Sequence, residues 1–130
     1  MPLFTVTMKS GRAAAEKAAI SRAIHQASVS AGYPHDDMFQ RFLCLEQDDL
    51  KFDPYYPGLA KARTEKILMI EVLVSSITDA GRKQRLLTAL VETLDRAGTD
   101  PNDIMVLFGE IDRTSSSFGG GRLAPPVVVA

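Results

Sequence analysis

The chain has 130 residues, of which 45% are hydrophobic and 24% charged, a composition typical of one globular domain. Fifteen basic and sixteen acidic residues give a net charge of -1, which argues against an electrostatic nucleic-acid binder and against a polybasic membrane anchor. No apolar run approaches the roughly 20 residues of a membrane helix, no signal-peptide pattern opens the chain, and the single cysteine, Cys44, excludes an internal disulfide, so we expect a cytoplasmic protein.

The first half of the chain predicts a strand, a helix and a second strand. Apolar residues and threonines alternate within residues 3–8, which is typical of a strand. A helix is expected over residues 12–30, because alanines and isoleucines recur there at steps of three and four, and Gly32 and Pro34 end it. Residues 38–45 are again rich in apolar side chains and predict the second strand.

The second half predicts the same order of elements after a long surface segment. Residues 46–65 contain repeated Asp, Pro and Gly turn signals and are expected to form an excursion with at most a hairpin. Residues 67–74 are apolar at every position except Glu71, which indicates a strand covered on both faces. A second helix is expected over residues 79–97 and a last strand over residues 104–108.

The two halves resemble each other in element order. When the two helix-ending glycines, Gly32 and Gly98, are aligned, Asp37 falls on Asp103. A strand–helix–strand unit makes its two strands parallel through a right-handed crossover. We therefore expect an α/β fold in one domain, with duplicated βαβ units, a four-stranded mixed sheet and two helices on one face. The expected boundaries are pseudo-repeats at about 2–45 and 67–110, the excursion at 46–65 and a C-terminal tail at 112–130.

One face of such a sheet needs cover that the two helices cannot supply. A symmetric oligomer of the chain is the simplest source of that cover. The apolar residues 127–129 favour it, because an exposed apolar segment is an aggregation hazard unless it pairs. In the alternative, the excursion at 46–65 folds back over the sheet.

Four short motifs stand at characteristic places in this repeat. They are Pro2 at the start of the first strand, Ser10-Gly11-Arg12 at its end, Gly-x-Pro-x-x-Asp over residues 32–37, and Ser117-Phe118-Gly119 followed by Gly121-Arg122. A duplicated βαβ chain with these motifs resembles the tautomerase superfamily over nearly its whole length, and its last two motifs look most like the malonate semialdehyde decarboxylase branch. The resemblance implies a homotrimer and a small-molecule carboxylate or carbonyl substrate, with no cofactor, metal, nucleic acid or membrane partner.

Pro2 is the predicted catalytic residue. The resemblance implies that Met1 is removed, which leaves the Pro2 nitrogen as a secondary amine that can take a proton. A free α-amino group titrates at about pH 8, and burial and nearby cations lower that pKa toward neutrality. Such a base would carry out keto–enol tautomerisation of a small 2-oxo or enol acid, the chemistry of an isomerase. In the alternative, Met-Pro is an ordinary start of a chain.

Asp37 is the second predicted catalytic residue. The resemblance implies that the matching aspartate of the decarboxylase branch positions or activates water, so a hydratase or decarboxylase with protonated Pro2 as the acid is an alternative function. Because Asp103 occupies the equivalent Pro-Asn-Asp turn, an ordinary turn role for Asp37 also stays open. A third hypothesis is a non-catalytic oligomer that keeps the fold without the chemistry.

The predicted substrate-binding residues also come from the resemblance. They are Arg12, Phe39, Ser75, Ile77 and Phe118. Arg12 matches an arginine that binds a substrate carboxylate from a neighbouring subunit in 4-oxalocrotonate tautomerase. Ser75 and Ile77 replace two arginines of the decarboxylase branch, and Phe39 replaces a second-strand arginine. We therefore expect a less cationic pocket, with Arg41, Arg63 and Arg122 as candidate substitutes.

Overall fold

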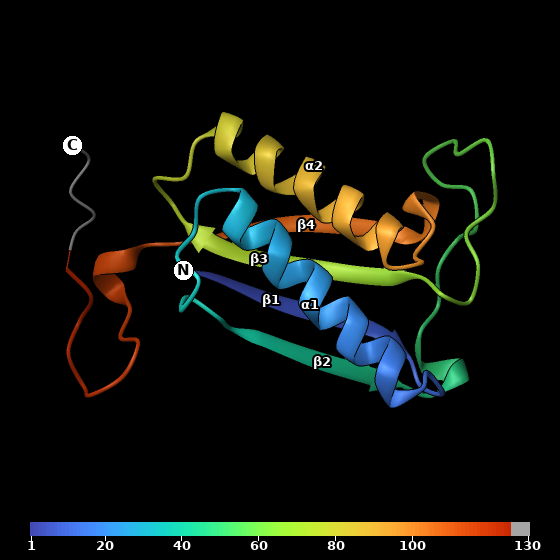
Figure 1. Ribbon diagram of the computed structural model, residues 1–130, viewed down its shortest axis with the longest axis horizontal. Coiled ribbons are helices and arrows are strands. Elements are labelled where there is room, and N and C mark those ends of the chain that lie inside the picture. Colours follow the sequence, from blue (N-terminus) through green and yellow to red (C-terminus); the bar gives the residue numbers. More distant parts are fainter. Residues whose placement is uncertain (126–130) are drawn as a thin grey trace.

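The computed structural model describes residues 1–125 (Figure 1), so the apolar residues 127–129 lie outside the described residues. The main elements are β1 (Pro2–Lys9), α1 (Ala14–Ser30), β2 (Gln40–Leu45), β3 (Leu68–Ser75), α2 (Ala80–Arg96) and β4 (Ile104–Ile111). Single 3₁₀ turns are η1 (Gln47–Asp49), η2 (Pro101–Asp103) and η3 (Arg113–Ser115). Within residues 1–125, no helix combines the length and apolarity that crossing a membrane demands.

The strands form one mixed sheet in the order β2-β1-β3-β4. β1 is parallel to β2, and β3 is parallel to β4, as each βαβ unit requires, whereas β1 and β3 meet antiparallel at the centre. Both helices lie on the same face of this sheet (Figure 1). The predicted fold class, with a four-stranded mixed sheet and two helices on one face, is confirmed.

Local signals explain where the helices begin and end. Asp79 caps α2 by accepting a hydrogen bond from the backbone N–H of Arg82, 2.7 Å away. Gly32 and Gly98 follow the two helices with φ of +100° and +104°, a conformation that L side chains rarely adopt. The predicted start of the first helix is two residues early, because Ala13 has extended backbone and is the N-cap of α1.

The hydrophobic core lies between the two helices and the sheet. Inward side chains such as Val6, Ile24 and Leu90 are fully buried there. One polar bond crosses the core, because the Thr93 hydroxyl of α2 donates to the Ala23 carbonyl of α1 at 2.8 Å. This bond joins the helices of the two pseudo-repeats.

The limits of the first and third strands differ from the prediction by one residue at each end, and two other limits differ by more. The second strand begins at Gln40 rather than at residue 38. The last strand continues three residues beyond Phe108 to Ile111, because Leu73, Val74 and Ser75 of β3 supply pairing partners there. This longer β4 carries the chain to the cavity described below.

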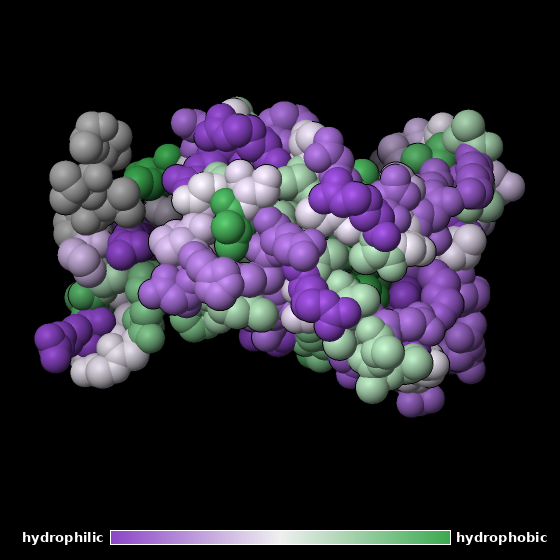
Figure 2. Space-filling view, viewed as in Figure 1, coloured by the Kyte–Doolittle hydropathy of each residue, from purple (hydrophilic) through white to green (hydrophobic). Residues whose placement is uncertain are grey.

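The opposite face of the sheet is open in the single chain, so the cover predicted for the second face of β3 does not come from this chain alone. Along β3 the burial alternates, because Glu71 and its neighbours on the same face lack helix cover. Leu43 and Leu107 are also 46% and 51% exposed. The segment before β3 does not cover this face, since it packs beyond the strand ends (Figure 1), where Thr64 binds Asp103. By contrast, mostly hydrophilic side chains lie on the outer surface of the molecule on the side of the helices (Figure 2).

Candidate functional site

A cavity of about 720 Å³ opens at the end of the sheet where β1 begins and β3 ends. The antiparallel pairing of these strands places Pro2 opposite Val74 and so brings the N-terminus to this end. The walls come from the N-terminus, the end of α1, the turn before β2, the start of α2 and the segment after β4. The lining residues are Met1, Tyr33, Pro34, Asp36, Asp37, Phe39, Val74, Ser75, Ile77, Thr78, Asp79, Arg82, Ile111, Arg113 and Phe118. A space of this size is typical of small-molecule sites.

The N-terminal amine lies in this cavity. The α-ammonium nitrogen of Met1 is 2.6 Å from Oδ2 of Asp37, and both residues are largely buried. The turn that carries Asp37 is held by a hydrogen bond from its N–H to the Pro34 carbonyl, and the Phe4 N–H ties the same segment to β1 through the Phe39 carbonyl. Pro2 follows Met1 as the buried first residue of β1. An amine and a carboxylate are thus fixed side by side at the cavity.

The equivalent aspartate of the second half has no such role. Asp103 is only 3% exposed, and its carboxylate accepts hydrogen bonds from the N–H and the hydroxyl of Thr64 at 2.6 and 2.7 Å. Thr64 therefore fills the position that the N-terminal amine takes in the first half. Of these two aspartates, Asp37 lines the cavity.

The structure brings most of the predicted site residues together. Asp37, Phe39, Ser75, Ile77 and Phe118 all line the cavity beside the N-terminus. The three apolar side chains among them are partly exposed, whereas the Ser75 hydroxyl oxygen is buried without a hydrogen-bond partner among the described residues. A buried hydroxyl without a partner costs roughly 1–3 kcal/mol, so Ser75 is an unsatisfied polar group in the wall of the cavity.

Arg12 lies away from this cluster. It follows β1 at the opposite end of the strand, where its Nη2 donates to the Lys66 carbonyl at 2.6 Å. Burial lowers the pKa of the Arg12 guanidinium, and Glu16, 3.8 Å from its Nη1, acts in the opposite direction. Within one chain, Arg12 therefore does not meet the residues around Pro2.

Two arginines that the sequence did not indicate line the cavity. Arg82, in the first turn of α2, stacks on Tyr33 with its Cζ 4.2 Å from the ring centroid. Arg113, in η3, lies with its Cζ 5.3 Å from the centroid of the Phe118 ring. A search for arginines just after a helix N-cap, where the first turn faces the strand ends, would have found Arg82.

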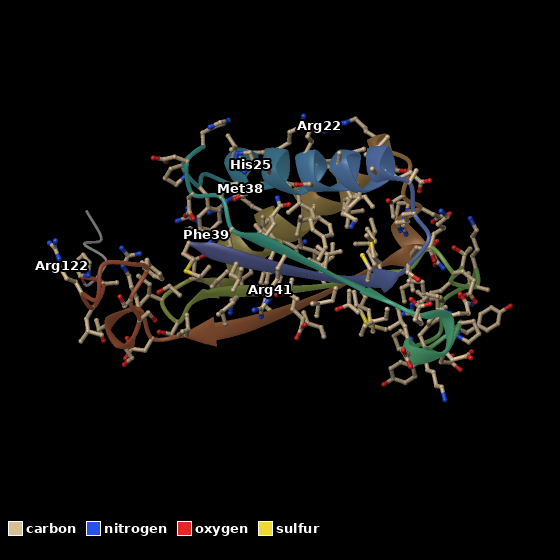
Figure 3. All side chains as sticks on the ribbon, turned by 90° about the horizontal axis from the view of Figure 1, so that it is seen from below. Arg22, His25, Met38, Phe39, Arg41 and Arg122 are labelled. Carbon is tan, nitrogen blue, oxygen red and sulfur yellow. The ribbon has the colours of Figure 1, made fainter. Side chains whose placement is uncertain are left out.

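The arginines named as substitutes do not line the cavity. Arg41 points away from the helices (Figure 3), and its Nε donates to the Thr5 hydroxyl at 2.8 Å. Arg63 donates to the Asp53 carbonyl in the segment before β3. Arg122 belongs to the exposed C-terminal loop in the same view. In the single chain the guanidinium groups that line the cavity are those of Arg82 and Arg113.

The charges around the cavity balance. Three cations line it, namely the Met1 ammonium, Arg82 and Arg113, together with three aspartates, Asp36, Asp37 and Asp79. In residues 1–125, no three His, Cys, Asp or Glu side chains are grouped so that they could hold a metal ion. The arrangement can bind a small acid with its guanidinium groups and exchange a proton with its amine and carboxylate.

Comparison with protein families and solved structures finds relatives of this fold. The family model described as "Tautomerase enzyme" matches residues 37–119. Among solved structures, FG41 malonate semialdehyde decarboxylase inhibited by 3-bromopropiolate aligns with a TM-score of 0.85 at 26% identity over 93% of this chain and 92% of that chain. A second malonate semialdehyde decarboxylase aligns with a TM-score of 0.85 at 25% identity, over 93% of each chain. Native fused 4-OT shares the fold, with a TM-score of 0.76 at 18% identity over 93% of this chain and 95% of that chain. No curated protein matches the sequence.

The fold and the matched residues define a member of the tautomerase superfamily, and the chain belongs to that family. Within it, the chain lies in the branch that resembles malonate semialdehyde decarboxylase. Members of this superfamily are enzymes.

Proposed function

We propose that this chain is a tautomerase-like enzyme in which the amine of Pro2, freed by removal of Met1, is the general base for keto–enol proton transfer on a small 2-oxo acid. One observation carries the proposal: the N-terminal amine lies in the cavity, 2.6 Å from Oδ2 of Asp37. Since Pro2 is the next residue and is itself buried, loss of Met1 would leave a secondary amine beside the same cavity.

The proposed step uses few groups of the chain. The neutral Pro2 nitrogen takes the proton from the carbon next to the substrate carbonyl, so the C–H bond breaks, its electron pair forms the C=C bond, and the π pair of the carbonyl moves to the carbonyl oxygen. The resulting ammonium then returns a proton to that oxygen, which completes the enol and restores the base. The Pro2 ring supports this geometry because it fixes the direction of the nitrogen.

The surroundings set the protonation of this amine in opposite directions. Arg82 and Arg113 line the cavity, and nearby cations disfavour the ammonium form of an amine. The Asp37 carboxylate lies beside the N-terminal nitrogen, and a neighbouring carboxylate favours the ammonium form. A base that works near neutral pH needs the first effect to match the second.

The Asp37 contact also favours a second candidate function, a hydratase or decarboxylase. A carboxylate beside the amine stabilises an ammonium that could act as an acid, and Asp37 could then position water. The likeness to two malonate semialdehyde decarboxylase structures supports this candidate. The loss of both arginines at Ser75 and Ile77 stands against the same substrate.

We further propose that the chain works as a homotrimer in the cytoplasm. Fused 4-OT, a neighbour in fold, forms symmetric and asymmetric trimers. The open face of the sheet, with exposed Leu43 and Leu107, offers apolar surface for contact between copies. Arg12 could then approach the cavity of a neighbouring copy, which one chain alone does not allow.

Two measurements test the catalytic proposal. Mass spectrometry of the protein should find Met1 absent. Rates with phenylpyruvate enol and 2-hydroxymuconate should then fall by at least about a hundredfold in Pro2→Ala, in line with the loss of a general base. Pro101→Ala, at η2 and away from the cavity, should keep the wild-type rate. Equal rates for wild type and Pro2→Ala would contradict the proposed role of Pro2.

A further inference from the structure

We propose that Arg82 binds the carboxylate of the substrate and that Tyr33 holds its guanidinium in place for this task. The inference rests on the proposed function and adds the group that recognises the negative charge of the acid. It assigns carboxylate binding to the first turn of α2, since Ser75 and Ile77 replace the two arginines of the decarboxylase branch.

Arg82 lines the cavity and has no counter-ion among the residues that the structure describes. No ion pair in the described part of the chain includes Arg82, although Asp36, Asp37 and Asp79 line the same cavity. Its Nε is buried and finds no acceptor within residues 1–125. A guanidinium carries five N–H donors in a rigid fork, so an arginine without acceptors in a cavity has its hydrogen-bonding capacity free for an anion.

The position of this guanidinium is fixed by stacking. Its Cζ lies 4.2 Å from the centre of the Tyr33 ring, and Tyr33 is buried. Nη2 lies beside the end of α1, 3.6 Å from the point where a Cβ on Gly32 would stand. A cation–π contact uses no hydrogen-bond acceptor, so the Nη1 and Nη2 donors of Arg82 remain for a planar acceptor such as a carboxylate.

A second unpaired donor belongs to the same cavity. The Ser75 hydroxyl is buried without a partner in the described chain, so Ser75 and Arg82 both have unused hydrogen-bonding capacity. Arg113 on the other wall differs, because its Nε donates to the Pro125 carbonyl at 2.8 Å. These contacts favour Arg82 over Arg113 as the carboxylate-binding residue.

The test compares an acid with its uncharged isostere. Phenylacetate and phenylacetamide share shape but differ in charge, and calorimetric titration of the full chain gives the affinity for each. The variants are Arg82→Met, Arg82→Lys and Arg113→Met. Arg85→Met, an exposed arginine on the same helix outside the cavity lining, is the matched control. Circular dichroism confirms that each variant keeps its fold.

The proposal expects wild type and Arg85→Met to bind phenylacetate more tightly than phenylacetamide. Arg82→Met should weaken phenylacetate binding by about tenfold or more and leave phenylacetamide binding within about twofold, since it removes a charge-assisted hydrogen bond. Arg82→Lys should lose part of the preference for the acid, because an ammonium cannot bind both oxygens through a fork; this variant also decides the matter if Arg82→Met does not fold. Wild type without a preference for the acid, an unchanged Arg82→Met, or a loss confined to Arg113→Met would overturn the assignment.

The same titrations in a Pro2→Ala background separate this inference from the proposed function. If phenylacetate binding depends on Arg82 while Pro2→Ala reacts as fast as wild type, the result supports the proposed role of Arg82 and contradicts the role of Pro2 as base. If Pro2→Ala loses activity but phenylacetate binding does not depend on Arg82, the result contradicts the proposed role of Arg82 and supports that of Pro2.

Discussion

Asp37 and Asp103 close equivalent turns in the two halves of the chain, yet their carboxylates have different partners. Asp37 meets the N-terminal ammonium at the cavity, whereas Asp103 is buried against Thr64. A sequence pattern describes both turns equally well. The partner that reaches each turn decides which aspartate is available for chemistry.

Asp37→Asn separates the two candidate functions. The change removes the negative charge beside the amine but keeps a side chain of similar shape. We expect tautomerisation of phenylpyruvate enol to stay within about tenfold of wild type, because the proposed base is Pro2, while any hydration or decarboxylation stops. Steady-state rates of both reactions check this. A loss of tautomerisation as large as that of Pro2→Ala would contradict the proposed division of roles.

Asp103→Asn should act on stability instead. The carboxylate accepts two hydrogen bonds from Thr64 in a buried position, and an amide can accept only through its oxygen. We expect a loss of about 1–3 kcal/mol in the free energy of unfolding, measured by urea denaturation. An unchanged midpoint would show that Thr64 finds other partners.

A buried hydroxyl of α2 joins the two helices by a hydrogen bond. Thr93→Val removes the hydrogen bond to the Ala23 carbonyl but keeps the branched shape, so we expect a loss of about 1–2 kcal/mol in unfolding free energy. Thr88→Val, at an exposed position of the same helix, makes the identical chemical change and should cost less than about 0.5 kcal/mol. Chemical denaturation of both variants measures the difference, and equal losses would contradict a special role for the Thr93 bond.

The segment before β3 is attached to η2 by an exposed ion pair between Lys61 and Asp100. The hydrogen bond from Lys61 is the main cause that lowers the pKa of Asp100 in the folded chain. A lowered folded pKa means stability that is present above the pKa of the unfolded aspartate, about 4, and lost as pH falls through the folded value. The stability advantage of wild type over Asp100→Asn should therefore shrink between neutral pH and about pH 3 in urea denaturation. A constant difference would contradict the pairing.

Periodicity predicted the elements better than it predicted their surroundings. The alanine and isoleucine pattern fixes α1 to within two residues, and the pairing pattern of β4 corrects its end by three. Arg82 escaped prediction because its importance depends on Tyr33, which reaches it from the end of the other helix. Contacts between distant segments of this kind leave no local periodic signal.

The open face of the sheet is the part of the molecule that a single chain leaves without cover. An unbroken apolar run in β3 predicted cover on both sides, and the single chain covers one. The proposed source of cover is contact between copies, with Glu71 and Arg41 as charged residues on that face.

Leu107→Lys tests this contact. It places a charge at an exposed apolar position of the open face, so we expect the proposed trimer to dissociate in light scattering coupled to gel filtration. Tyr56→Lys, at a residue that is 74% exposed in the segment before β3, makes a comparable change elsewhere and should leave the assembly intact. A monomeric wild type, or a trimeric Leu107→Lys, would contradict the proposal.

The ion pair between the first residue and Asp37 has a practical consequence for anyone who prepares this protein. An affinity tag fused ahead of Met1 would turn the amine into an amide, remove its charge and place extra chain at the mouth of the cavity. If the proposed function holds, such a sample would fold and still show no turnover. Assays of the proposed activity therefore call for protein without an N-terminal fusion, or with one cut cleanly before Pro2.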